Sequence, residues 1–331
     1  RFTLISMASP GRDVKLSKDR VTGNRNFITK IWSANNFLKL NNCKLDKKIN
    51  INVIKLPINQ WIYNEFIRTQ NLVSKNIEIF RFDEAAKYVY QFVWHSYCDW
   101  YLEFLKPIFS SKNKLEIKEA RLFSSFMMAN ILKLLHPFIP FFTESIWSKN
   151  DYKKVFKNNL ISTEWPEYKK NNKFNKNYDD INNIIEFISS IRSTKAELKV
   201  TPKLFCDIFF VEKASKLNLV VKKNITLVKQ VGRINNILKN KETNKNTIKI
   251  LVLNEKVSLK FSENIDLVSQ KQNILLKLAN IEKKSNIIKN KLNNKAFLKN
   301  APKNIVENDK RVLDELTIED EKLRSIVTSI N

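Results

Sequence analysis

Residues 82–147 constrain the fold of this chain more than any other part of its sequence. Apolar residues recur in this segment at steps of three and four, and no glycine interrupts the repeat. The spacing predicts a long amphipathic helix over 82–108 and a second helix over 115–135. The second helix should end before Pro137, because the residue that precedes a proline avoids the helical conformation. Helices joined by a short loop lie antiparallel, so the segment predicts an aromatic-rich helical bundle.

Segments on both sides of this region carry the same helical spacing. We predict further helices over residues 19–40, 57–79, 141–147 and 181–198. Pro57 would then occupy the first turn of its helix, where proline is tolerated. The opening residues 2–7 are apolar and end in a turn sequence, so they read as the last part of an element that begins earlier. We therefore expect the chain to be a fragment of a longer protein.

The pattern changes after Pro202. Residues 204–211 are apolar, β-branched and aromatic, and they have the length of a strand. Residues 246–261 read as two strands that turn at 254–256. Between these regions, residues 214–238 are predicted to be helical, with an interruption at Gly232 and Arg233. The sequence therefore predicts a small mixed α/β element here.

The last part of the chain has the most regular repeat. Its steps of four and three average 3.5 residues, which is the period of a coiled coil. The repeat restarts after a link that contains Pro302, so two helices could fold back as an antiparallel hairpin. The predicted seam residues are Ile274, Leu278, Ile281, Ser285, Ile288 and Leu292 in the first helix, and Ile305, Asp309, Val312, Leu316, Glu319, Leu323, Ile326 and Ile330 in the second.

These elements predict a mainly α protein. It would contain a helical-bundle domain, a small α/β connection and a C-terminal antiparallel coiled-coil hairpin. We place the segments at residues 1–18, 19–165, 166–262 and 263–331. No apolar run approaches the roughly 18 residues that a membrane-spanning helix needs, so we expect no membrane partner.

The formal net charge of +26 points to a polyanionic partner, most simply a nucleic acid. Part of the lysine and asparagine excess would also arise from an AT-rich genome. The three cysteines are far apart in the sequence, which fits a reduced cytoplasmic compartment and neither a zinc site nor a disulfide framework. The sequence has no glycine-rich phosphate loop and no nucleophile motif. His95 and His136 are interpreted as structural, so we identify no catalytic residue and no metal site.

Five phrases of the sequence, in order, resemble the C-terminal part of the bacterial valyl-tRNA synthetase family, which belongs to the class I aminoacyl-tRNA synthetases. They are RFTLISMASPGRD, GNRNFITKIWSANNF, FRFDEAAKYVYQFVWHSYCDWYLEFLKP, LHPFIPFFTESIW and KLNNKAFLKNAPKNIVENDKRVLDEL. The resemblance spans essentially the whole chain. It implies that residues 1–18 end a catalytic domain, that 19–165 bind the anticodon, that 166–262 connect, and that 263–331 form a tRNA-binding arm.

The family attaches valine to tRNA(Val) with ATP and magnesium. The resemblance implies that the catalytic signatures and the editing insertion would lie upstream of Arg1. We therefore expect this chain to bind tRNA(Val) as a cytoplasmic monomer, to hold no cofactor and to be inactive alone. The phrase KLSKD at residues 15–19 resembles the family's Lys-Met-Ser-Lys-Ser loop, but we interpret it as a chance match in a lysine-rich sequence.

Candidate tRNA-binding residues come from two regions. In the bundle they are Arg25 and Lys30, on the segment that resembles the family's GNRNF phrase, and Trp61. Trp61 is either a core residue or a platform on which a base stacks. Gln60 stands before it, where family members often have arginine. In the arm, the candidates for phosphate contacts are Lys283, Lys284, Lys289 and Lys291.

Two other functions stay open at this point. The chain could be a non-catalytic basic coiled-coil protein that binds RNA or a protein partner without specificity for valine tRNA. It could also be a free-standing tRNA-binding factor. Preference for valine tRNA over other RNA of similar length would distinguish the first alternative from the synthetase reading.

Overall fold

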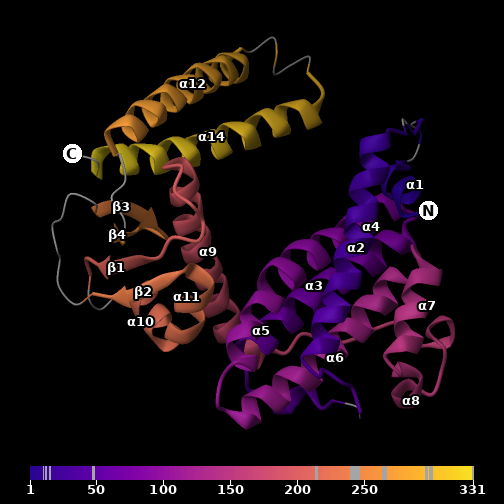
Figure 1. The fold of residues 1–331 in the computed structure, drawn as a ribbon. Helices are drawn as coiled ribbons and strands as arrows, with labels where there is room; N and C mark the ends of the chain where they lie inside the picture. Colours follow the sequence, from indigo (N-terminus) through magenta and orange to yellow (C-terminus); the bar gives the residue numbers. More distant parts are fainter. Residues whose placement is uncertain are drawn as a thin grey trace. The chain divides into compact units, whose positions relative to one another are not determined.

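The structure is a computed structural model that describes residues 1–9, 11, 13–14, 16–46, 49–212, 215–238, 247–262, 267–294, 297 and 301–329. The chain divides into two compact units, Arg1–Asn182 and Asn183–Asn331. Every regular element described in the first unit is a helix, and the second unit combines a small sheet with helices (Figure 1). The prediction of a mainly α protein with a small α/β element is confirmed. Within the described part of the chain, no helix is both long and apolar enough to cross a membrane.

The helices of the first unit form a bundle with an aromatic core. α3 packs against α4 and α6, and α2 packs against α6. The α-helices are α1 (Phe2–Met7), α2 (Lys18–Leu40), α3 (Pro57–Glu78), α4 (Phe82–Gln91), α5 (Leu102–Phe109), α6 (Lys114–Leu135), α7 (Pro140–Lys149) and α8 (Tyr152–Phe156), and α9 (Asn175–Glu197) begins in this unit. Short 3-10 helices lie at Ile51–Val53, Leu160–Ser162 and Asn172–Phe174. The helices predicted from apolar spacing are confirmed, and Pro57 lies in the first turn of α3 as expected.

The predicted helix over 82–108 is continuous, but its middle is wider than an α-helix. Residues Phe92–Tyr101 form a π-helical segment between α4 and α5. In a π-helix the backbone hydrogen bonds span five residues, so the apolar positions no longer follow the α-helical period. The segment points Phe92, Tyr97 and Tyr101 into the core, where each is almost completely buried.

Ser17, in the phrase that resembles a synthetase loop, has a local structural role. Its side chain caps α2 by accepting a hydrogen bond of 3.3 Å from the backbone N–H of Arg20. A serine at this position satisfies one of the free N–H groups of the first helical turn. The structure thus gives Ser17 a reason to be present that needs no catalytic loop.

The first turn of α3 is capped by a residue from another helix. Its own N-cap, Leu56, has no side chain that can accept a hydrogen bond. Glu119 of α6 instead accepts bonds from the backbone N–H groups of Leu56, at 2.9 Å, and Lys55, at 3.1 Å. It also accepts a bond of 2.9 Å from the side chain of Asn59. The carboxylate therefore satisfies donors at the positive end of α3 and fixes α6 against it.

Asp83 joins the segment after α1 to the start of α4. Its buried carboxylate accepts two hydrogen bonds of 3.0 Å from the Arg81 guanidinium and one of 3.0 Å from the Ser9 hydroxyl. The Arg81 hydrogen bonds lower the pKa of Asp83 from 3.8 to about 2. The ionised form is therefore the one that the folded protein stabilises.

The Asp83→Asn variant is expected to lose about 1.5 to 3 kcal/mol of unfolding free energy at pH 7, the range for hydrogen bonds to a charged group. Because folding lowers this pKa, the contribution is fully present above the unfolded-state value near pH 4 and is lost as the pH falls toward 2. Urea unfolding between pH 7 and pH 2 should therefore show a smaller acid-induced loss in the variant than in the natural chain. Asp151→Asn, at an exposed ion pair, is the control. Equal pH dependence in the natural chain and the Asp83 variant would contradict the assignment.

The second unit contains a four-stranded sheet with the order β2-β1-β4-β3 (Figure 1). β1 (Cys206–Phe210) pairs in parallel with β2 (Ile234–Ile237) and antiparallel with β4 (Glu255–Phe261), which also pairs with β3 (Thr247–Val252). α9 packs on the sheet through Phe187, whose ring stacks on that of Phe210. The remaining helices before the arm are α10 (Lys216–Lys223) and α11 (Ile225–Gly232).

The predicted helix over 214–238 is wrong in its last part. The helical region ends at Gly232, Arg233 adopts a left-handed conformation with φ of 54°, and Ile234–Ile237 forms β2. Apolar residues three apart, Ile234 and Ile237, fit a helix as well as a short strand, and pairing with β1 decides the outcome. The predicted hairpin is confirmed over the described residues 247–261. Its turn lies at Leu253 and Asn254, which both have positive φ, and not at the predicted 254–256, because Glu255 and Lys256 belong to β4.

The arm consists of α12 (Leu267–Asn293) and α14 (Lys303–Ser329), which pack along each other as the predicted antiparallel hairpin (Figure 1). The predicted seam is confirmed where the two helices are most tightly packed. Ile274, Leu278, Ile281, Leu323 and Ile326 are all buried. Of the polar seam positions, Ser285 is also buried, Asp309 is half-buried and Glu319 is exposed. The predicted seam is wrong at Ile305, which is exposed. Ile330, the last predicted seam residue, lies outside the described residues.

Candidate nucleic-acid interface

The four arm lysines lie on the solvent-facing side of α12. Lys283, Lys284, Lys289 and Lys291 are all exposed, while the seam residue Ile281 is buried against α14. None of the four forms an ion pair with another described residue. Lys277, nearer the base of the helix, is instead paired with Glu197 at 2.5 Å. The outer part of α12 therefore presents uncompensated positive charge, which suits a phosphate backbone.

The two α2 candidates are in different situations. The ammonium group of Lys30 lies 2.6 Å from the Asp99 carboxylate and 3.8 Å from the centre of the Trp94 ring. These contacts hold α2 against the π-helical segment, and the Asp99 carboxylate neutralises the positive charge of Lys30. Arg25 is exposed. The structure does not bring Arg25 and Lys30 together, because five residues along an α-helix place them on different faces.

Trp61 belongs to the core of the bundle. Its side chain is 2% exposed, and its indole N–H donates a hydrogen bond of 2.9 Å to the side chain of Asn182. The edge of the Phe104 ring packs against it, with 6.2 Å between ring centres. Of the two readings that the sequence left open, the geometry favours a core residue, because the ring has no free face for a base.

A basic groove at the start of α6 was not predicted from the sequence. It consists of two adjoining hollows that share Lys44 and Asp46. The first has a volume of about 520 Å³ and is lined by Asn42, Lys44, Asp46, Lys114, Ile117, Lys118, Arg121 and Leu122. The second has a volume of about 530 Å³ and is lined by Lys39, Cys43, Lys44, Leu45, Asp46, Lys149, Asn150, Asp151, Lys154 and Val155. Cations from α2, the segment after it, α6, α7 and α8 therefore line the groove.

Part of this groove has a signal in the sequence. Lys114, Lys118 and Arg121 are separated by four and three residues, so they share one face of the first turns of α6. Their spacing predicts a basic stripe on a helix, a pattern that an ordinary solvated face also produces. Only the fold shows that the segment after α2 lies opposite this stripe and completes a hollow.

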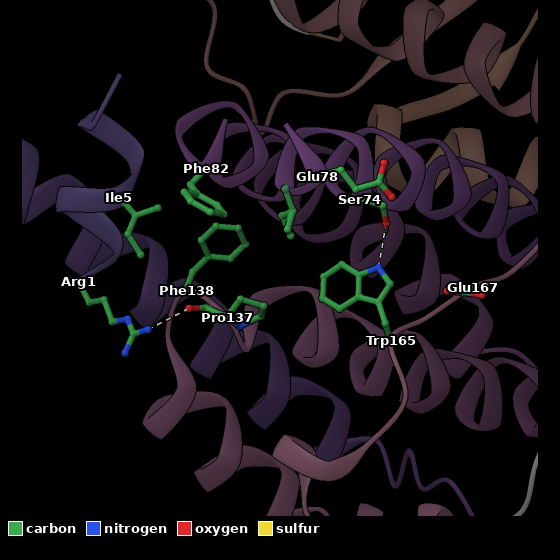
Figure 2. Close-up of a pocket in the computed structure, with 10 residues that line it drawn as sticks. Arg1, Ile5, Ser74, Glu78, Phe82, Pro137, Phe138, Trp165 and Glu167 are labelled. Atoms are coloured by element: carbon green, nitrogen blue, oxygen red, sulfur yellow. Dashed lines mark hydrogen bonds between the residues drawn. The ribbon is translucent and has the colours of Figure 1, made fainter. Parts of the chain in front are cut away.

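A third hollow, of about 550 Å³, has a different character (Figure 2). Figure 2 shows the side chains of Ile5, Phe82, Phe138 and Trp165 around it, with the Trp165 indole N–H bonded to the Ser74 hydroxyl at 2.8 Å. Its charged lining residues are Arg1, Glu78 and Glu167. An apolar hollow with more acidic than basic residues suits a polyanion less well than the basic groove does.

The histidines have structural surroundings. The Nδ1 atom of His136 lies 2.9 Å from the Thr143 hydroxyl, and burial lowers the pKa of its ring. His95 is exposed, and its Nδ1 atom lies 3.4 Å from the Asp99 carboxylate. Neither ring lines the basic groove.

Comparisons with known proteins connect both regions to tRNA. The family described as the anticodon-binding domain of tRNA ligase matches residues 59–210, and the family described as the valyl tRNA synthetase tRNA binding arm matches residues 266–331. A valine–tRNA ligase of Pelagibacter ubique (strain HTCC1062) is 43% identical over 312 residues, which are 94% of this chain and 35% of that protein. The corresponding protein of Rhizobium meliloti (strain 1021) is 34% identical over 98% of this chain and 34% of its own length. The chain thus spans about a third of the length of the curated relatives that it matches.

Proposed function

We propose that this chain is the tRNA-recognition portion of a valine–tRNA ligase, because nearly all of it is similar to about a third of the length of such enzymes. One observation carries the proposal: a single chain contains an anticodon-binding domain followed by a tRNA-binding arm. Both regions expose basic side chains, in the groove of the bundle and on α12 of the arm. Basic surfaces on two different units of the chain suit one large polyanion better than a small ligand.

The two regions have different roles in this proposal. The bundle meets the anticodon, because unpaired loop bases can be splayed out and read individually by protein side chains. The arm holds the phosphate backbone at another part of the tRNA, which fixes orientation without reading sequence. The partner in this proposal is tRNA(Val), which the relatives' name, valine–tRNA ligase, supports. In this proposal, ATP and magnesium bind to the parts of the relatives' longer chains that this chain does not match. The chain itself acts as a monomer in the cytoplasm.

A basic coiled-coil protein without tRNA specificity explains less of the molecule. It accounts for the packing of α12 on α14 and for the exposed lysines. It gives no reason for the match of residues 59–210 to an anticodon-binding domain.

Binding of the full 331-residue chain to valine tRNA transcripts tests the proposal. Transcripts with an altered anticodon should bind about tenfold or more weakly than the native transcript, since a lost base contact costs roughly 1 to 3 kcal/mol. A transcript altered only in its acceptor stem is the matched control and should bind like the native one. Measurements at two salt concentrations separate charge attraction from base reading. Equal and steeply salt-dependent binding of all transcripts would leave only non-specific attraction and contradict the proposal.

A further inference from the structure

We propose that the first hollow of the basic groove binds a phosphodiester of single-stranded RNA, with Arg121 as its principal ligand. The inference rests on the proposed function, since it assigns one contact within tRNA recognition. Lys114, Lys118 and Arg121 approach the hollow from one face of α6, and Lys44 approaches it from the segment after α2. Asp46 is the single acid among the described lining residues. The hollow therefore has a strong excess of positive charge on a concave surface.

Arg121 distinguishes this hollow from a merely lysine-rich surface. Its side chain is half-buried, and its Nε atom is buried without a hydrogen-bond partner. Within the described residues, its guanidinium forms no ion pair. The Nε atom itself is enclosed by the protein, so an anion in the hollow would meet the terminal nitrogens of the guanidinium group. A phosphate supplies several acceptor oxygens, and the planar fork of arginine matches their geometry.

The surroundings of Arg121 leave its charge uncompensated. Cys43 lies close to it, and burial raises the pKa of that thiol to about 11, so it is neutral at pH 7. The backbone N–H groups at the start of α6 are not needed to bind the anion. Those of Leu115 and Glu116 already donate hydrogen bonds to the side chain of Asn113. The anion would thus contact side chains, and it would lie near the positive end of α6, where the helix dipole favours a negative charge.

The second hollow of the groove is a weaker anion site. Lys154 is paired with Asp151 at 2.9 Å, Lys39 donates to the backbone carbonyl of Lys149, and the ammonium of Lys149 lies over the Trp32 ring. These cations already have partners within the protein. The adjoining hollows accommodate a strand that continues from one to the other, since each is within the range of roughly 300 to 1,000 Å³ that holds small ligands. The phosphate contact is assigned to the first hollow because its cations form no ion pair with another described residue.

The test combines protein variants with neutralised RNA linkages. The RNA is the anticodon stem-loop of valine tRNA, made with one uncharged methylphosphonate linkage at a time. Arg121→Gln should bind the unmodified stem-loop about tenfold more weakly than the natural chain, and its salt slope should be shallower by roughly 0.7 to 0.9. At one linkage, the methylphosphonate should weaken binding to the natural chain and have no further effect on Arg121→Gln.

Three additional variants make the result independent of folding defects. Lys118→Gln, at an exposed position, should weaken binding in the same direction. Asp46→Asn should strengthen it, because it removes the acid that repels a phosphate. Lys75→Gln is the matched control for charge: it lies near the other end of α3, roughly 27 Å along the helix from Pro57, and should bind like the natural chain. Thermal unfolding of each variant checks that it is folded.

The outcomes separate this inference from the proposed function. If the natural chain binds valine tRNA but Arg121→Gln and Lys118→Gln bind like Lys75→Gln, the phosphate site is overturned and the proposed function stands. If inorganic phosphate abolishes the Arg121 effect and no linkage shows coupling, the hollow binds a free anion and the RNA assignment is overturned. If the natural chain does not bind tRNA, both proposals fail.

Discussion

Replacing Trp61 with alanine is expected to lower the unfolding free energy of the first unit by about 3 to 5 kcal/mol, the range for removing a large buried aromatic side chain. The indole is 2% exposed, packs against Phe104 and donates a hydrogen bond to Asn182. The substitution leaves a cavity and an unpaired acceptor. Urea unfolding followed by tryptophan fluorescence measures the effect on this unit alone, because all six tryptophans of the chain lie within residues 1–182.

A Trp61→Phe variant is the matched control. It keeps an aromatic ring in the core and removes the N–H donor, so we expect a smaller loss of about 1 to 3 kcal/mol. Under conditions in which each variant is folded, tRNA affinity should equal that of the natural chain. If a stably folded Trp61→Ala variant binds tRNA more weakly, Trp61 is a platform on which a base stacks, and the core assignment is wrong.

Replacing the four arm lysines with glutamine is expected to reduce tRNA binding through charge alone. Lys283, Lys284, Lys289 and Lys291 are exposed, so the change should leave stability nearly unaffected. If all four contact phosphates, the slope of log affinity against log salt should become shallower by roughly 3. The loss of affinity should therefore be larger at low salt than at high salt.

The arm prediction needs a control with the same change in net charge. Four exposed lysines elsewhere in the second unit provide it: Lys203, Lys216, Lys222 and Lys249. Their replacement by glutamine should alter the salt slope much less than the arm substitutions. Equal slopes for the two quadruple variants would mean that the arm lysines act only through overall charge.

Local rules predicted most of the helical part of this fold. Periodic apolar residues, Pro57 in a first turn and Pro137 after a last turn each act within a few residues, so the sequence alone reveals them. The π-helical segment Phe92–Tyr101 has no such signal, because its apolar residues fit an α-helix equally well. β2 was missed for a related reason: Ile234–Ile237 becomes a strand through pairing with β1, nearly 30 residues earlier.

The candidate site was harder to predict, because a residue's type does not reveal whether its charge is already satisfied. Lys30 is paired with Asp99, which lies 69 positions away in the sequence. Gln60 is buried and donates to the carbonyl of Ile54 while accepting from Asn177. Arg121 shows the opposite case, a cation that forms no ion pair with another described residue, and only tertiary structure identifies it.

The cap that Glu119 provides for α3 also bears on the order in which the bundle forms. The N–H groups of Lys55 and Leu56 receive their acceptor from a residue more than 60 positions later in the chain. During synthesis the first turn of α3 emerges well before that acceptor exists, so it should fray until α6 has been made and has docked. Late closure of a long loop slows folding. In the full chain, Glu119→Ala should accordingly speed hydrogen exchange in the first turn of α3 while the rest of that helix stays protected.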